Sequence, residues 1–249
     1  MNNLILIGTS HIAKESVNKV KKTIIDKKPD IVAVELDAKR FYGLMHSKVK
    51  AKFSFYSLRR VGLTGFIFAL IGSWASKKLG KLVGVQPGDE MKQAIKSAKK
   101  IKTKIALIDQ DIEITLARFS KEFTAKEKWR IFVDIFNGLF FKKREMEKYG
   151  LKDLDLSKVP EDKLIIKLID MMRIRYPSIY KVLIHERNVY MVKKLQDLMT
   201  ANPYKTIVAV VGAGHIDGMR KLLEKSIYTF SSSYTYEGQE EQTVGFTDY

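Results

Sequence analysis

The chain has 249 residues, of which 45% are hydrophobic and none is cysteine. This length suffices for one large domain or two small ones, and the lack of cysteine excludes disulfides, a thiolate nucleophile and zinc sites with cysteine ligands. The formal net charge of +17 favours contact with polyanions. However, lysines are spread over almost every helical stretch, and the chain has no helix-turn-helix, zinc-finger or RNP-type motif. We therefore expect a lysine-rich solvated surface and no dedicated nucleic-acid site.

The N-terminal residues lack the basic region and cleavage site of a signal peptide. This absence and the lack of cysteine suit a reducing compartment. We expect a cytoplasmic protein, with the alternative of a peripheral position at a membrane.

Strand-like and helix-like patterns alternate at both ends of the chain. Apolar runs of strand length occupy residues 3–8, 31–36, 103–109 and 205–212. Helical patterns occupy residues 14–28, 37–50, 87–100, 111–149, 160–173, 178–200 and the stretch after 215. The run "IVAVEL" at 31–36 is continuous and β-branched, which is typical of a strand buried on both faces of a parallel sheet.

This alternation predicts an α/β fold with a mainly parallel sheet core and a helical insertion or cap. We expect one domain over residues 1–226, with helical insertions at about 50–103 and 111–200. Residues 227–249 contain four acidic and no basic side chains and are expected to form a tail. Both a disordered end and a strand that pairs late remain open for this tail.

Two of the predicted strands end in the same motif, Gly-x-x-His. The first is "GTSH" at residues 8–11 and the second is "GAGH" at residues 212–215. Two further predicted strands end in a carboxylate, Glu35 and Asp109. Ligands of open parallel sheets bind beyond the carboxyl ends of the strands, where we expect His11, Glu35 and His215 to converge. The glycines would let the backbone turn sharply and let a ligand approach closely.

Two histidines and a carboxylate are sufficient ligands for a divalent metal ion with open coordination positions. They equally suit general acid–base catalysis without a metal. Each carboxylate also has a purely structural alternative, because Glu35 and Asp109 could each cap the helix that follows.

The segment "SIYKVLIHERNVYMVKKL" places Glu186 within an apolar stripe on a helical wheel, with Arg187 at its edge. The stripe comprises Ile179, Val182, Leu183, Val189 and Tyr190. A carboxylate in such surroundings needs a partner or a shifted pKa. It belongs either to an internal Glu–Arg network that orients the helix or to a substrate clamp. We expect His46 and His185 to be ordinary surface or packing residues.

Residues 61–76 carry no charge and are flanked by Arg59-Arg60 and Lys77-Lys78. Sixteen residues fall short of the roughly 20 that span a bilayer. The segment therefore suits a buried cap helix, a contact between subunits of a homo-oligomer, or a membrane surface. We favour the first two.

Several stretches, taken in order, resemble the TraB/PrgY/GumN family, and its archaeal members in particular. They are "GTSHIAKES", "VAVELDAKRF", "GVQPGDEMKQAI", "IALIDQDIEITLARF", "HERNVYMVKKL" and "VVGAGHIDGM". The resemblance extends from about residue 3 to 225. It implies a relation to the Tiki proteases, which are metal-dependent peptidases, and a more distant similarity to erythromycin esterase-like and ChaN-like proteins. The pheromone-shutdown members of the family suggest peptide ligands.

The resemblance implies roles for particular residues. His11, Glu35 and His215 would bind a divalent metal such as Mn, Co, Zn or Fe. Arg187 would be the electrostatic helper that stabilises the developing oxyanion. Beyond the resemblance, we expect a spare carboxylate, Glu186 or Asp109, to act as the general base. The chain departs from the family pattern at Gln110, where an arginine usually follows the aspartate.

We therefore expect a metal-dependent hydrolase, a peptidase that acts on peptides or protein N-termini. One alternative is a catalytically silent peptide-binding or membrane-associated regulator. The other is a metal-free hydrolase that uses histidine and glutamate directly.

Overall fold

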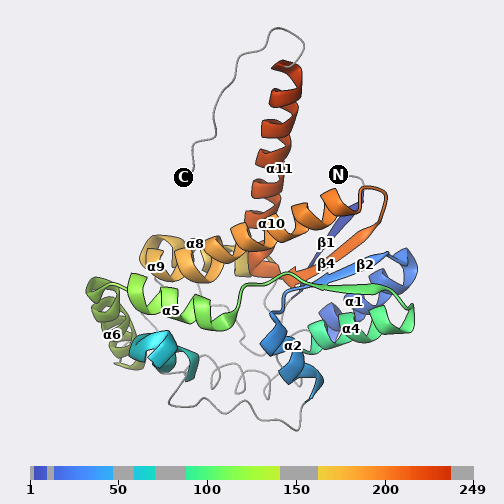
Figure 1. Ribbon diagram of the computed structural model, residues 1–249. Coiled ribbons are helices and arrows are strands. Elements are labelled where there is room, and N and C mark those ends of the chain that lie inside the picture. Colours follow the sequence, from blue (N-terminus) through green and yellow to red (C-terminus); the bar gives the residue numbers. More distant parts are fainter. Residues whose placement is uncertain (1–2, 10–13, 47–58, 71–87, 141–161, 237–249) are drawn as a thin grey trace.

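The computed structural model describes residues 3–9, 14–46, 59–70, 88–140 and 162–236. It contains a four-stranded sheet with helices on both faces, so the predicted α/β class is confirmed (Figure 1). The strands are β1 (Leu4–Thr9), β2 (Ile31–Val34), β3 (Lys104–Leu107) and β4 (Ile207–Gly212). All neighbouring strands pair in parallel, in the order β1-β4-β2-β3.

The last strand of the chain lies inside the sheet, between β1 and β2. Every residue of β2 and β4 is buried, as expected for their continuous apolar sequences. The register pairs Thr9 with Gly212 and Val34 with Val210. The carboxyl ends of β1, β4 and β2 are therefore neighbours, so the strands that precede both Gly-x-x-His histidines end side by side.

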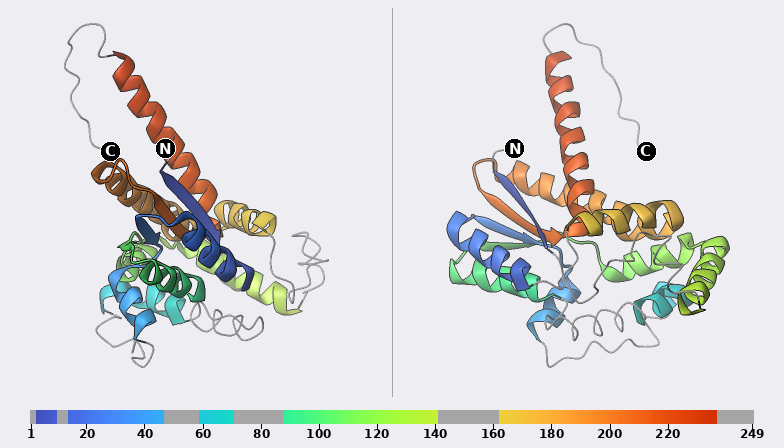
Figure 2. Two further views of the ribbon diagram at one scale, coloured as in Figure 1. Left: turned by 90° about the vertical axis from the view of Figure 1, so that its right-hand side faces the viewer. Right: turned by 180° about the vertical axis from the view of Figure 1, so that it is seen from behind.

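Two helical layers bury the faces of the sheet (Figure 2). One face is covered by α1 (Lys14–Lys27) and α4 (Asp89–Lys100), the other by α10 (Glu186–Ala201) and α11 (Ala213–Tyr236). Successive strand residues point to opposite faces, so Val208 and Val210 join the first core whereas Ala209 and Val211 join the second. Two helices that lie within the predicted insertions, α4 and α10, therefore pack directly on the sheet.

The remaining helices form a group beside the sheet (Figure 1). The group comprises the helix at 59–70, α5 (Ile112–Glu122), α6 (Ala125–Phe140), α8 (Asp162–Arg175), α9 (Pro177–Tyr180) and the five-residue π-helix η1 (Lys181–His185). A separate core forms around Phe119, Ile179 and Val182. The short helix α2 (Ala38–Met45) follows β2. The predicted helical cap is therefore present, with its own core.

Two groups of polar contacts, one around the buried Glu127 and one around the partly buried Asp134, stabilise these helices. Glu127 accepts hydrogen bonds from the backbone N–H of Ser178, at 2.8 Å, and from the hydroxyl of Thr124, at 2.8 Å. Asp134 accepts hydrogen bonds from the Arg175 guanidinium and from the Tyr176 hydroxyl. Burial and the Asp134 carboxylate raise the pKa of Tyr176 to about 12. These contacts join α6 to the end of α8 and the start of α9.

The uncharged segment at 61–76 is described as far as residue 70. Its helix packs on α5 through Val61, Gly65 and Phe68, and the Phe68 and Phe119 ring centroids are 4.4 Å apart. Leu63 and Ile67 lie on the exposed side, and Leu63 is 66% exposed. The predicted cap helix is thus buried on one side only, and contact of its other side with a membrane or a second subunit stays a prediction. Within the described residues, no helix is both long and apolar enough to cross a membrane.

The final helix α11 extends to Tyr236 and projects away from the sheet (Figure 1). Residues 227–236, which the sequence analysis assigned to the tail, therefore continue a helix and form no strand. Residues 237–249 lie outside the described part of the chain.

Candidate functional site

Glu35 follows the last residue of β2 and is buried at the carboxyl end of the sheet. Its Oε2 accepts a hydrogen bond of 2.6 Å from the backbone N–H of Gly212, at the end of β4. Its Oε1 accepts a hydrogen bond from Arg187 and lies 3.3 Å from His215 Nε2. The predicted convergence of Glu35 and His215 is therefore confirmed.

His215 lies in the first turn of α11, directly after β4, and is buried. Its Nδ1 is 2.7 Å from the Oδ1 of Asn188 on α10. Both ring nitrogens therefore face an acceptor oxygen, Asn188 Oδ1 at one side and Glu35 Oε1 at the other. The ring is held between two helices and the central strands of the sheet.

Arg187 is the cation at the centre of the site. Its Nη2 donates to Glu35 Oε1 and to Asp109 Oδ2, the latter at 2.6 Å, and its Nε donates to Asp109 Oδ1 at 3.1 Å. Its Nη1 donates to the carbonyl oxygen of Leu183 at 3.3 Å. Four of the five guanidinium N–H groups therefore have an acceptor among the described residues.

The charges of Glu35 and Arg187 stabilise each other against burial. Burial by itself raises the pKa of Glu35, but His215, Arg187 and the Gly212 N–H together lower it well below its usual range. Burial likewise opposes the charge of Arg187, yet Glu35 and Asp109 raise its pKa. Glu35 is therefore an ionised carboxylate in a buried site.

Asp109 completes the network from the end of β3, and its side chain is fully buried. Its Oδ2 accepts from Arg40 as well as from Arg187, and Arg40 also donates to Asp37 Oδ2 at 2.6 Å. Its Oδ1 accepts from the backbone N–H of Gln110 at 2.8 Å. The arginines that pair with Asp109 therefore come from α2 and α10, and the pairing does not depend on the residue at position 110.

Neither Glu35 nor Asp109 caps the helix that follows it. Asp37 caps α2 by accepting from the Arg40 N–H at 2.9 Å, and Asp111 caps α5 by accepting from the Glu113 N–H at 2.7 Å. The alternative of two helix caps is thus wrong, and both buried carboxylates belong to the network around Arg187.

The structure places Glu186 differently from the helical wheel. Its carboxylate pairs with Arg118 of α5, at 2.6 and 3.2 Å, and its side chain is 22% exposed. The π-helix at 181–185 changes the helical phase just before Glu186. The buried side chains after it are Asn188, Met191, Val192 and Leu195, two positions later than the predicted Glu186, Val189 and Tyr190, and both Val189 and Tyr190 are exposed. Glu186 does pair with an arginine, but not with Arg187, and its carboxylate does not join the Arg187 network.

The first glycine of the "GTSH" motif has a packing role. A Cβ atom on Gly8 would lie 2.8 Å from Ile216 Cγ1 of α11. Gly8 lies within β1 and has no positive φ. Gly8 was expected to allow a sharp turn and the close approach of a ligand. In the structure it instead allows β1 and α11 to pack closely.

Three residues of the network escaped the sequence analysis: Asp37, Arg40 and Asn188. Asp37 is an aspartate directly before a helical pattern, which is the usual signal of an N-cap and could have identified it. Nothing in the sequence distinguishes Asn188, because its burial depends on the π-helix. His11 lies outside the described residues, two positions after Thr9.

Comparison with known proteins identifies the family of this chain. The model of the TraB/PrgY/gumN family matches residues 2–231. An uncharacterized protein of Methanocaldococcus jannaschii is 38% identical over 226 residues, which cover 90% of this chain and 54% of that protein. The TraB domain-containing proteins of mouse and human are each 26% identical over 239 residues, which cover 87% of this chain and 61% of theirs.

The chain thus spans between 54% and 61% of the length of these relatives. The family match covers all four strands and every described residue of the site. The chain, with its paired Gly-x-x-His motifs on neighbouring strands, therefore belongs to the TraB/PrgY/gumN family.

Proposed function

We propose that the protein is a metal-dependent hydrolase that cleaves peptides or the N-terminal segments of proteins. The observation that carries the proposal is the pair formed by Glu35 Oε1 and His215 Nε2, 3.3 Å apart in a buried site. Peptides are proposed as substrates because the family includes members that shut down peptide pheromones.

The spacing of this pair suits two ligands of one metal ion. Ligand atoms at about 2.0–2.2 Å from a tetrahedral metal are separated by roughly 3.3–3.6 Å. The described residues contain no group of three His, Cys, Asp or Glu side chains placed for metal binding. We propose His11 as the third ligand, because it follows the strand that ends beside Gly212. A bound divalent ion would activate water and polarise the scissile carbonyl group.

The chain's own residues orient this site. Arg187 fixes Glu35 Oε1 and screens its charge from that of Asp109, which lets two carboxylates lie side by side in the interior. Its fifth N–H group, on Nη1, can donate to the oxygen of a substrate carbonyl as negative charge develops there. Asp109 is a weak candidate for the general base, because arginines occupy both of its oxygens.

The direct Glu35–His215 contact also favours a second candidate, a hydrolase that needs no metal. In that mechanism His215 removes a proton from water, and the ionised Glu35 stabilises the resulting imidazolium. The two mechanisms differ in whether a chelator abolishes turnover.

A peptide-library digest read by mass spectrometry tests the proposal. The protein is purified without chelator, analysed for metals, and assayed with Mn, Co, Zn, Fe or EDTA. We expect metal-dependent cleavage, and a loss of at least about 100-fold for Glu35→Gln, His215→Ala and His11→Ala. His185→Ala is the matched control, because His185 is exposed, and it should retain the parent's rate.

Three results would contradict the proposal. Cleavage that persists in EDTA would support the metal-free mechanism. Unchanged cleavage by Glu35→Gln and His215→Ala would remove the site assignment. Peptide binding without cleavage under any metal would identify a regulator that keeps the fold.

A further inference from the structure

We propose that Asn188 is a positioning residue that holds the proton of neutral His215 on Nδ1 and so keeps the Nε2 lone pair directed at Glu35. The inference concerns the same buried site and rests on the proposed function for its catalytic consequence. The state of the His215 ring can, however, be measured without any activity.

An amide oxygen faces Nδ1 of His215. Asn188 Oδ1 lies 2.7 Å from His215 Nδ1, and an amide oxygen can only accept a hydrogen bond. Nδ1 must therefore carry a proton. In the neutral ring the other nitrogen, Nε2, then has a lone pair.

That lone pair points at another acceptor. Nε2 is 3.3 Å from Glu35 Oε1, and both oxygens of Glu35 already accept hydrogen bonds, Oε1 from Arg187 and Oε2 from the Gly212 N–H. Two electron-rich atoms at this distance repel each other unless a cation or a proton lies between them. By holding the proton on Nδ1, Asn188 prevents a hydrogen bond from Nε2 to Glu35. It leaves lone pairs on both Nε2 and Oε1 that can bind a positive ion, and hydrogen-bond partners of metal-bound histidines commonly orient the ring in this way.

Packing restricts the orientation of the Asn188 side chain. Asn188 is 1% exposed, at the point where α10 packs on α11. Gly218 lies three residues after His215, hence on the same side of α11, and a Cβ atom at position 218 would overlap the Asn188 side-chain amide. The missing side chain at Gly218 provides the space in which Asn188 reaches the His215 ring.

The alternative is that Asn188 only fills space between α10 and α11. That role predicts no particular position for the His215 proton. If Asn188 were absent, Nε2 of the neutral ring would gain the proton and donate it to Glu35 Oε1. The position of the proton therefore separates a positioning role from a packing role.

Two-bond ¹H–¹⁵N NMR spectra of ¹⁵N-labelled full-length protein report which ring nitrogen is protonated. We would record them at about pH 8.5, with His215→Ala to assign the signal. We expect the Nδ1–H form in the parent protein. A parent ring with its proton on Nε2 would overturn the inference without the need for any variant.

Substitutions extend the test. Asn188→Ala should move the proton to Nε2, whereas Asn188→Asp, which keeps an acceptor oxygen, should retain it on Nδ1. Gly218→Ala should act like Asn188→Ala because it displaces the amide. Gly43→Ala is the matched control, since it lies in helix α2 and no atom lies within 4 Å of its added Cβ. An unchanged Nδ1–H signal in Asn188→Ala would show that the residue is packing only.

Zn²⁺ titration by calorimetry separates this inference from the proposed function. We expect Asn188→Ala to bind Zn²⁺ about 10–100-fold more weakly than the parent, with Asn188→Asp closer to the parent. If the parent binds no Zn²⁺, Mn²⁺ or Co²⁺, the metal-dependent function fails while the NMR result still decides the role of Asn188. If metal binding is normal and the tautomer is unaffected by Asn188→Ala, the inference fails and the function stands.

Discussion

Arg187 is the residue that makes the buried site electrostatically feasible. It contacts both Glu35 and Asp109 at a point where both carboxylates are buried. Removing one partner of a buried ion pair leaves an uncompensated buried charge, which costs far more free energy than the intact pair contributes. The loss of Arg187 would therefore destabilise the fold mainly because buried carboxylates would lose this counter-ion. Two predictions follow from this balance of charges.

The first prediction compares Arg187 with an arginine near the surface. Arg187→Leu leaves Glu35 and Asp109 facing each other, and we expect it to lower the free energy of unfolding by about 3–5 kcal/mol. Arg118→Leu removes the pair with Glu186, but the Arg118 side chain is 40% exposed, so its effect should stay below about 1 kcal/mol. Urea unfolding of both variants measures the difference. Equal losses would mean that Arg187 is not the main counter-ion of the site.

The second prediction concerns acid stability. The folded pKa of Glu35 lies well below its usual range, whereas the unfolded value is about 4.3. Its contribution is therefore fully present above the unfolded pKa and is lost as the pH falls through the folded pKa. We expect Glu35→Gln to show a shallower loss of unfolding free energy below about pH 5 than the parent. Parallel losses in denaturant titrations at a series of pH values would contradict this expectation.

At the scale of elements, the π-helix at 181–185 determines which side chains enter the site. It joins α9 to α10 and adds one residue to the helical path. Ile179 before it and Val182 within it keep the expected buried positions, while the buried positions after it lie two residues later than predicted. The shift brings Arg187 and Asn188 to the sheet and turns Glu186 toward α5.

The third prediction uses a deletion within this turn. Deleting the exposed His185 should restore a regular helix while the buried positions on both sides stay in phase. We expect the unfolding free energy to change by no more than about 1 kcal/mol, the usual scale of a surface change plus local strain. Deleting the exposed Lys194 is the control, because it rotates the rest of α10 by about 100° and turns residues beyond it, such as Leu198, from the sheet.

Thermal melts and circular dichroism distinguish the two deletions. Loss of the folded state in both would show that the π-helix is required for folding. Retention of the fold in both would show that the phase of α10 matters less than its buried contacts suggest.

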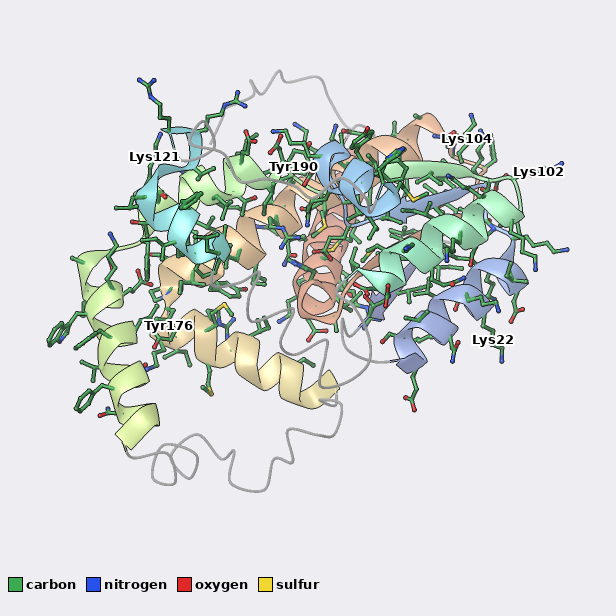
Figure 3. The ribbon with its side chains drawn as sticks, turned by 90° about the horizontal axis from the view of Figure 1, so that it is seen from below. Lys22, Lys102, Lys104, Lys121, Tyr176 and Tyr190 are labelled. Carbon is green, nitrogen blue, oxygen red and sulfur yellow. The ribbon has the colours of Figure 1, made fainter. Side chains whose placement is uncertain are left out.

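At the scale of the whole molecule, charged and apolar surfaces are distributed differently. The labelled lysines Lys22, Lys102 and Lys104 lie on one side of the molecule and Lys121 on the other, all directed outward (Figure 3). This distribution over separate elements suits a general basic surface. In contrast, the helix at 59–70 has one packed side and one exposed apolar side.

The fourth prediction tests the two sides of that helix. Phe68→Ser should lower the free energy of unfolding by about 2–3 kcal/mol, below the range for a fully buried phenylalanine, because Phe68 packs on Phe119 but is only partly buried. Leu63→Ser should change it by less than about 0.5 kcal/mol, because the side chain is 66% exposed. Denaturant unfolding gives both values. A large loss for Leu63→Ser would place this residue in a contact between subunits.

Much of the architecture follows from the sequence itself. Continuous β-branched runs predict strands that are buried on both faces, and β2 and β4 are buried throughout. The positions of Glu35 and His215 at strand ends also follow from the sequence, because parallel strands present their carboxyl ends at one edge. Local patterns suffice here because a strand's period and its burial are properties of neighbouring residues.

Only the tertiary structure decides which partners these residues meet. It inserts β4 between β1 and β2, which places the Gly212 N–H on Glu35, and it brings Arg40 to Asp109 across 69 positions of the chain. It also keeps Glu186 out of the Arg187 network and brings Asn188 to His215, because a π-helical turn changes the direction of every later side chain in the helix. Strand order and helical phase depend on contacts between distant segments, and a periodicity within one segment contains no information about them.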